Sequence, residues 1–197
     1  GDDALYVATY ARDGAHRTWP KRISAAESEH FADALYKVTQ GANMGWPYTF
    51  YDSARHVRLL QPEYGGNGTK PVTDSKYAVP VTAFHAHVAP MDIAFYDASQ
   101  FPAHYRDGAF IAMHGADSCD VAGFNGGYDV MFVPMSGDGR AGPPERFASG
   151  FAGPTHADLC AKVAAYRPVG VAVGPNGALY IADSQKGRIW RISYGKN

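Results

Sequence analysis

The stretch that most constrains the fold runs from Arg167 to Tyr194. It contains three short apolar segments, the first two separated by Gly-Pro-Asn-Gly and the last two by Asp-Ser-Gln-Lys-Gly. β-Branched and aromatic residues favour strands, while Gly and Asn accept the positive φ angles of tight turns. The pattern therefore predicts a meander of three antiparallel strands, at 169–173, 178–182 and 188–194.

The middle strand of this meander is echoed twice elsewhere in the chain. Residues 177–182 read Gly-Ala-Leu-Tyr-Ile-Ala, residues 3–8 read Asp-Ala-Leu-Tyr-Val-Ala, and residues 108–113 read Gly-Ala-Phe-Ile-Ala-Met. One small sheet cannot bury both of its faces, so a recurring strand indicates a repeat architecture. The unequal spacing of the copies indicates insertions, of which the Gly- and Pro-rich run 48–77 is the longest and is predicted to contain no strand.

The rest of the chain shows the same short strands. Further strands are predicted at 5–9, 34–38, 81–84, 93–96, 109–113, 130–133 and 146–147. Only 24–31 and 155–165 have a helical pattern. A composition with 19% charged residues, 22 Gly and 13 Pro also favours loop-rich all-β structure.

Grouped by their breaks, the strands form sets of three, four and three. Tandem antiparallel sheets of this size are the blades of a β-propeller. We expect an all-β chain of about three blades, with pieces near 1–87, 88–153 and 154–197, open at both ends. Unpaired edges are an aggregation hazard, so the chain is expected to be the C-terminal part of a larger propeller and to need its missing N-terminal part. A small complete β-sandwich is the alternative.

Charge and cysteine content limit the partners and the compartment. A net charge of −1 without a basic face argues against nucleic-acid binding, and no apolar run reaches the roughly 18 residues of a membrane span. Cys119 and Cys160 suggest one disulfide, with two unrelated buried thiols as the alternative. A periplasmic or secreted protein is predicted, whose export signal has been removed or lies upstream.

Five segments in register resemble the C-terminal half of the glucose/sorbosone dehydrogenase family. These segments are 41–52, 77–115, 126–137, 147–151 and 167–192. The family consists of six-bladed quinoprotein propellers that hold pyrroloquinoline quinone (PQQ) with Ca²⁺. The resemblance implies oxidation of a sugar or aldose by hydride transfer to the quinone, and an external electron acceptor. It also places the family's histidine base in blades that precede this sequence, so the chain lacks that base.

The resemblance implies several cofactor contacts. Arg167 matches a guanidinium that binds the cofactor carboxylates, a role that suits its planar fork. His87 matches a polar cofactor contact, and His114 ends a strand in reach of the same channel mouth. A metal site is an alternative for His85 and His87, which share one face of an extended segment, with His114 or Asp92 as a further ligand.

The loop that follows the first strand, Tyr10-Ala-Arg-Asp, matches the calcium loop of the family. The resemblance makes Tyr10 a cofactor contact and Ala11 and Arg12 backbone ligands of the metal. Asp13 is the predicted catalytic residue, which would orient the missing base. Here the sequence departs from the family's His-Gly-Arg-Asp, and a second departure at 116–120 brings an acid where carboxylates should be bound.

Two other functions stay open. A calcium-dependent propeller lactonase would use carboxylate and amide side chains, for which Asp92, Asn125, Asn176 and Asp183 are the candidates. A non-catalytic propeller module with a degenerate cofactor site would explain both departures. The larger aromatic residues are expected to pack between blades: Trp46, Tyr128, Phe132, Tyr180 and Trp190.

Overall fold

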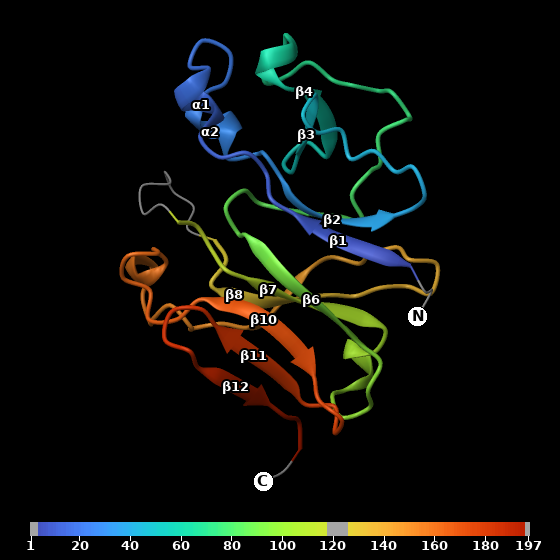
Figure 1. The fold of residues 1–197 in the computed structure, drawn as a ribbon, viewed down its shortest axis with the longest axis vertical. Helices are drawn as coiled ribbons and strands as arrows, with labels where there is room; N and C mark the ends of the chain where they lie inside the picture. The colour runs from blue at the N-terminus through green and yellow to red at the C-terminus, as the bar shows by residue number, and fades with distance from the viewer. Residues whose placement is uncertain (1–3, 118–125, 196–197) are drawn as a thin grey trace. The chain divides into compact units, whose positions relative to one another are not determined.

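The computed structural model describes residues 4–117 and 126–195. These fall into two compact units, here called the first unit (4–87) and the second unit (88–195). Both are built from short antiparallel strands, as Figure 1 shows. In the described part of the chain, no helix is both long enough and apolar enough to span a membrane.

The first unit contains a three-stranded sheet and a separate hairpin. The sheet has the order β1-β2-β5, with β1 (Leu5–Thr9), β2 (Asp33–Val38) and β5 (Thr82–Phe84). The hairpin pairs β3 (Thr49–Asp52) with β4 (Val57–Leu60). Two one-turn helices, α1 (Ala15–Thr18) and α2 (Ala25–Ser28), and the 3₁₀ turn η1 (Pro62–Tyr64) complete the unit.

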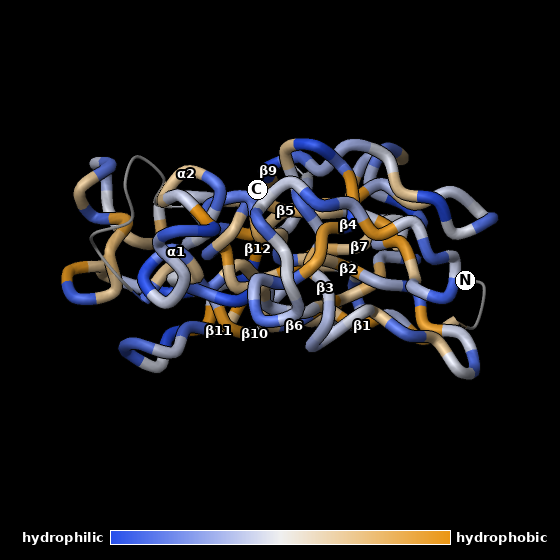
Figure 2. The backbone as a smooth tube through the Cα atoms, turned by 90° about the horizontal axis from the view of Figure 1, so that it is seen from above, coloured by the Kyte–Doolittle hydropathy of each residue, from blue (hydrophilic) through white to orange (hydrophobic). Residues whose placement is uncertain are grey.

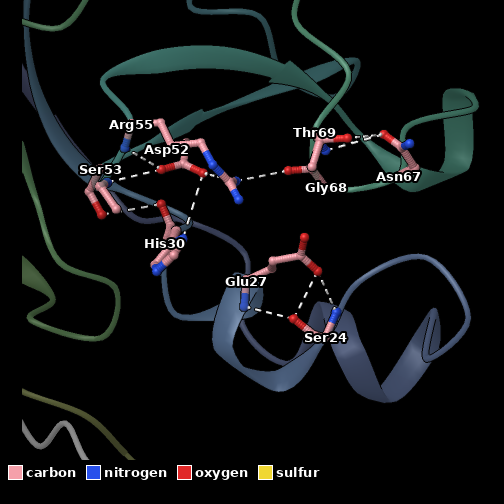
Figure 3. Close-up of polar contacts among 10 residues, drawn as sticks. Ser24, Glu27, His30, Asp52, Ser53, Arg55, Asn67, Gly68 and Thr69 are labelled. Carbon is pink, nitrogen blue, oxygen red and sulfur yellow. Dashed lines mark hydrogen bonds and ion pairs between the residues drawn. The ribbon is translucent and has the colours of Figure 1, made fainter.

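The hairpin β3–β4 corrects the prediction that the run 48–77 contains no strand. Thr-Phe-Tyr in β3 favours a strand, and Asp52 then closes the turn. Asp52 Oδ1 accepts the backbone N–H groups of Ala54 and Arg55 at 2.9 and 2.8 Å, as Figure 3 illustrates in part. The Arg55 guanidinium bridges Asp52 Oδ2 and the Gly68 carbonyl, so the following loop is tied to the hairpin.

One helical turn forms within the first predicted helical stretch, 24–31, whereas the second stretch, 155–165, does not form an α-helix. In the first, only α2 forms, and a capping box explains its start because Ser24 Oγ accepts the Glu27 N–H while Glu27 accepts the Ser24 N–H. In the second, only the 3₁₀ turn η3 (His156–Asp158) forms. Helix α1 was not predicted.

The second unit contains two sheets. One has four strands in the order β6-β7-β8-β9: β6 (Pro90–Tyr96), β7 (Gly108–Met113), β8 (Asp129–Val133) and β9 (Glu145–Ala148). The other has the order β10-β11-β12: β10 (Pro168–Val173), β11 (Leu179–Asp183) and β12 (Ile189–Ile192). The turn η2 (Ala103–Tyr105) links β6 to β7. The predicted grouping into three, four and three strands is confirmed.

The core of the second unit lies between its two sheets. Strand β10 lies against β6 and β7, and aromatic side chains from the four-stranded sheet fill the centre. Phe110 contacts the rings of Phe132 and Phe147 with centroids 5.1 and 4.6 Å apart. In Figure 2 the hydrophobic segments coincide with strands such as β10 and β11, while the loops are mostly hydrophilic. This is the packing of neighbouring propeller blades.

The structure describes one of the two cysteines. Cys160 is buried and disulfide-bonded. Cys119 lies outside the described residues, as do Ser118, Asp120 and Asn125.

Asp129 makes the stability of the second unit depend on pH. Burial raises the pKa of this carboxyl to about 6, against the opposing effect of its ion pair with Arg146. The folded state therefore binds more protons than the unfolded chain between about pH 4 and 6, and the free energy of unfolding falls as the pH rises through this range. We expect Asp129→Asn to remove about 1–3 kcal/mol of that fall, which corresponds to a pKa shift of one to two units.

Urea unfolding at pH 4 and pH 7 measures this effect as the difference between wild type and variant, in which the contributions of other groups cancel. The prediction would be contradicted if the free energy of unfolding changed by the same amount between pH 4 and pH 7 in the wild type and in Asp129→Asn.

Candidate functional site

A pocket of about 430 Å³ opens in the first unit. Its walls come from the loop after β1, from β2 and from the β3–β4 hairpin with the segment before it. The lining residues are Thr9, Tyr10, Ala11, Arg12, Ala32, Tyr36, Met44, Trp46, Thr49, Phe50, Tyr51, Arg58 and Gln61. Three of the predicted site residues, Tyr10, Ala11 and Arg12, are therefore brought together in one wall.

The lining of this pocket is aromatic and cationic. Five of its members are Tyr, Trp or Phe, and two are Arg, with no Asp or Glu among the described residues that form the walls. The Arg12 guanidinium is paired with Glu63, whereas Arg58 has no carboxylate partner in the described chain. Arg58 is only 8% exposed, so a buried positive charge lies in the wall of the pocket.

Carbonyl and hydroxyl oxygens hold the Arg58 side chain in place. Its Nη1 donates to the Met44 carbonyl at 2.7 Å and to Thr49 Oγ1 at 3.0 Å. Its Nη2 donates to the Ala78 carbonyl and, at 3.4 Å, to the hydroxyl oxygen of Tyr36. The buried Tyr36 hydroxyl accepts this bond.

Two pocket residues offer groups that a ligand could contact: the side-chain oxygen of Gln61 and the indole of Trp46. Gln61 is buried, and its Oε1 has no hydrogen-bond donor among the residues that the structure describes. Trp46 is 69% exposed, which corrects the prediction that it packs between blades. A hydroxyl-rich ring would suit both, since it could donate to Gln61 and stack on an exposed indole.

A second cluster of the first unit surrounds His87, which follows β5 with its backbone in the left-handed region (φ 67°). The buried imidazole contacts Asp13 Oδ1 through Nδ1 at 2.7 Å. Glu29 Oε2 lies 3.1 Å from Nε2, an ion-pair contact without hydrogen-bond geometry. The structure therefore brings together Asp13 and His87, two predicted site residues, and adds Glu29, which the sequence analysis missed.

The His87 cluster leads to a prediction about protonation. The hydrogen bond that the His87 imidazole donates to the Asp13 carboxylate raises the pKa of His87 despite its burial, and the Glu29 carboxylate adds to the effect. The charged imidazole thus stabilises the fold fully below the unfolded pKa of about 6.5, and this contribution is lost as the pH rises through the higher folded pKa. In an NMR titration we expect His87 to titrate above 6.5 and Asp13→Asn to lower its pKa.

Asp74→Asn is the matched control, because Asp74 is an exposed carboxylate of the same unit that pairs with Lys76. It should leave the His87 titration unchanged. A His87 that titrates at or below 6.5 in the wild type would contradict the prediction.

In the second unit, Arg167 and His114 meet where β7 and β11 end and β10 begins. The Arg167 backbone N–H donates to Asp183 Oδ1 at 2.7 Å. Its guanidinium donates from Nε to the His114 carbonyl at 3.1 Å and from Nη2 to the Gly115 carbonyl at 2.7 Å. The guanidinium also lies over the Tyr128 ring, 5.5 Å from its centroid. Arg167 is therefore fixed in one orientation.

The His114 imidazole points to a different partner. Its Nε2 lies 2.8 Å from Ser184 Oγ. Burial, and next the nearby Arg167 charge, lower the pKa of His114. The side chain is therefore neutral at pH 7 and serves as a hydrogen-bonding group beside the guanidinium.

PQQ carries carboxylates, so Arg167 can bind it only if some of its guanidinium N–H groups are not already used within the protein. Nη2 also donates to Asp117 Oδ1 at 2.8 Å, but Nη1 has no acceptor within the described ranges. A buried, immobilised guanidinium with a spare edge fits one carboxylate of an anionic cofactor.

The side chains give no support to a metal site. No group of three or more His, Cys, Asp or Glu residues suited to a metal ion occurs within 4–117 and 126–195. Ala11 and Arg12 are predicted to bind Ca²⁺ through their backbone carbonyls, and that prediction does not depend on the side chains of the pocket. The Asp33 carboxylate lies beside this loop, where its Oδ1 accepts the Ala11 N–H at 2.7 Å.

The residues proposed for a lactonase have structural contacts instead. Asp92 Oδ2 accepts the Val171 N–H at 2.9 Å, and the two carboxylate oxygens of Asp183 accept the N–H groups of Arg167, Gln185 and Lys186. Asn176 Oδ1 accepts the Ala178 N–H within its turn.

Sequence comparison assigns the chain to one protein family. The TrAA12-like family model matches residues 58–195, more than half of the chain. No match was found among curated proteins.

Several solved structures share the fold at low sequence identity. An AA12 carbohydrate-active enzyme from Trichoderma reesei is 18% identical with a TM-score of 0.65, covering 95% of this chain and 49% of that one. A glucose dehydrogenase is 20% identical (TM-score 0.57; 98% and 41%). The PQQ-bound aldose sugar dehydrogenase of Streptomyces coelicolor is 18% identical (TM-score 0.51; 96% and 39%). The chain thus spans less than half the length of these structures and has their β-propeller fold.

Proposed function

This chain belongs to the TrAA12-like family, and we propose that it forms part of a PQQ-dependent dehydrogenase that oxidises a sugar or aldose. The observation that carries the proposal is the pocket of the first unit. Its aromatic walls suit stacking on a sugar ring, and Gln61 Oε1, which has no hydrogen-bond donor among the described residues, suits a sugar hydroxyl. When bound, the quinone would accept a hydride from the sugar carbon.

The residues of this chain would bind and orient. Arg167 would hold one cofactor carboxylate through its spare guanidinium edge, next to the neutral His114. Trp46 and Tyr10 would stack on the sugar, and Gln61 would accept a hydrogen bond from one of its hydroxyls. The resemblance of the sequence to glucose/sorbosone dehydrogenases supports this assignment, as do the names of the similar structures.

Asp13 would keep the role that the resemblance implies, orienting the base of the full protein. Its carboxylate lies 2.7 Å from Nδ1 of the His87 imidazole, which would hold it in place. An exported, periplasmic or secreted location and an external electron acceptor belong to the same proposal, and the disulfide of Cys160 agrees with an oxidising compartment.

Dye reduction by the full-length protein tests the function. We expect aldose-dependent reduction only after PQQ is added. Hydrolysis of lactones without quinone would instead select the lactonase, and the absence of both activities would select a non-catalytic module.

A further inference from the structure

Asp117 is an exposed carboxylate that pairs with Arg167, a buried arginine held by several hydrogen bonds. Its Oδ1 accepts from Arg167 Nη2 at 2.8 Å. The Asp117 side chain is 89% exposed, whereas the Arg167 side chain is 7% exposed. The two partners of this ion pair are therefore unequal, since one is fixed by its surroundings and the other projects into solvent.

Arg167 does not depend on Asp117 for its position. Two backbone carbonyls, those of His114 and Gly115, already hold Nε and Nη2, and Asp183 holds the backbone N–H. Asp117 contacts the guanidinium through a single hydrogen bond rather than a bidentate pair. Because the Asp117 side chain is largely exposed and makes only this one hydrogen bond to the guanidinium, a ligand anion can displace its carboxylate.

Building on the proposed function, we infer that Asp117 occupies the position on Arg167 at which a cofactor carboxylate would bind. Asp117 therefore competes with the anionic cofactor for the guanidinium. A ligand carboxylate at the Nη1 and Nη2 edge would lie beside Asp117, and two like charges on one guanidinium repel each other. Binding of the cofactor therefore requires Asp117 to swing out into solvent. Its high exposure leaves room for that movement.

Equilibrium titration of the full-length protein with PQQ, followed by quenching of protein fluorescence, tests this inference. We expect Asp117→Asn to bind PQQ about three- to tenfold more tightly than the wild type, because the competing charge is gone while the size of the side chain is kept. Asp138→Asn is the matched control. It removes an exposed carboxylate of the same unit that pairs with Arg140, and it should leave the Kd unchanged.

A double-mutant cycle links the effect to Arg167. In an Arg167→Lys background, the gain from Asp117→Asn should shrink to less than about twofold, because lysine lacks the planar fork that both carboxylates share. Circular dichroism confirms that each variant is folded before it is titrated.

The outcomes separate this inference from the function on which it rests. PQQ binding with equal Kd values for wild type and Asp117→Asn would overturn the competition and leave the proposed function standing. No PQQ binding by any folded variant would overturn both.

Discussion

Replacing Phe110 with alanine is expected to lower the free energy of unfolding by about 3–5 kcal/mol. Phe110 lies in β7 with no exposed surface and stands at the centre of the aromatic cluster of the second unit. Its ring contacts Tyr96, Phe101, Tyr105, Phe132 and Phe147. The surrounding rings cannot collapse into the space without leaving their own contacts, so the variant loses both the buried area and the packing around the cavity.

Urea unfolding measures this loss, and Phe95→Ala is the matched control. Phe95 is the same residue type on the neighbouring strand β6, but it is 45% exposed. Its replacement should cost less than about 1 kcal/mol. Equal losses in the two variants would show that Phe110 is not the centre of the core.

Arg58→Met is expected to destabilise the first unit by about 2–4 kcal/mol, because it leaves oxygens that the guanidinium now satisfies without a donor. The carbonyls of Met44 and Ala78 lose their contact, and so does the Thr49 hydroxyl. Methionine replaces the stem of the side chain but none of its N–H groups. The variant also removes the unpaired positive charge of the pocket.

Thermal and urea unfolding report the stability, and Arg17→Met is the control. Arg17 is an exposed arginine of the same unit, so its loss should change the free energy of unfolding by no more than about 0.5 kcal/mol. An Arg58→Met variant as stable as this control would mean that the bonds of Arg58 contribute nothing net.

The strands of the second unit were predictable because local chemistry determines them. The turn Gly-Pro-Asn-Gly before β11 contains Gly177 at φ 81°, a conformation that the sequence pattern requires. Strands β7, β8 and β10 carry β-branched and aromatic residues at the predicted positions. Hairpin β3–β4 was not predicted because its strands are only four residues long and the Gly and Pro residues around them favour loops.

The site was harder to predict because its contacts join residues that are distant in sequence. Glu29 meets His87 across 58 positions, and Arg58 reaches Tyr36 and Ala78 on either side of it in the chain. No local pattern marks such residues. Trp46 was assigned to packing because large aromatic residues are usually buried, and only the surrounding fold shows that it lines a pocket.

A crystal structure of the full-length protein soaked with PQQ would test the assignment most directly. We predict that a carboxylate of the quinone lies within hydrogen-bond distance of the Arg167 guanidinium and that Asp117 has turned away from it. A quinone bound elsewhere, with the Arg167–Asp117 pair intact, would contradict the assignment.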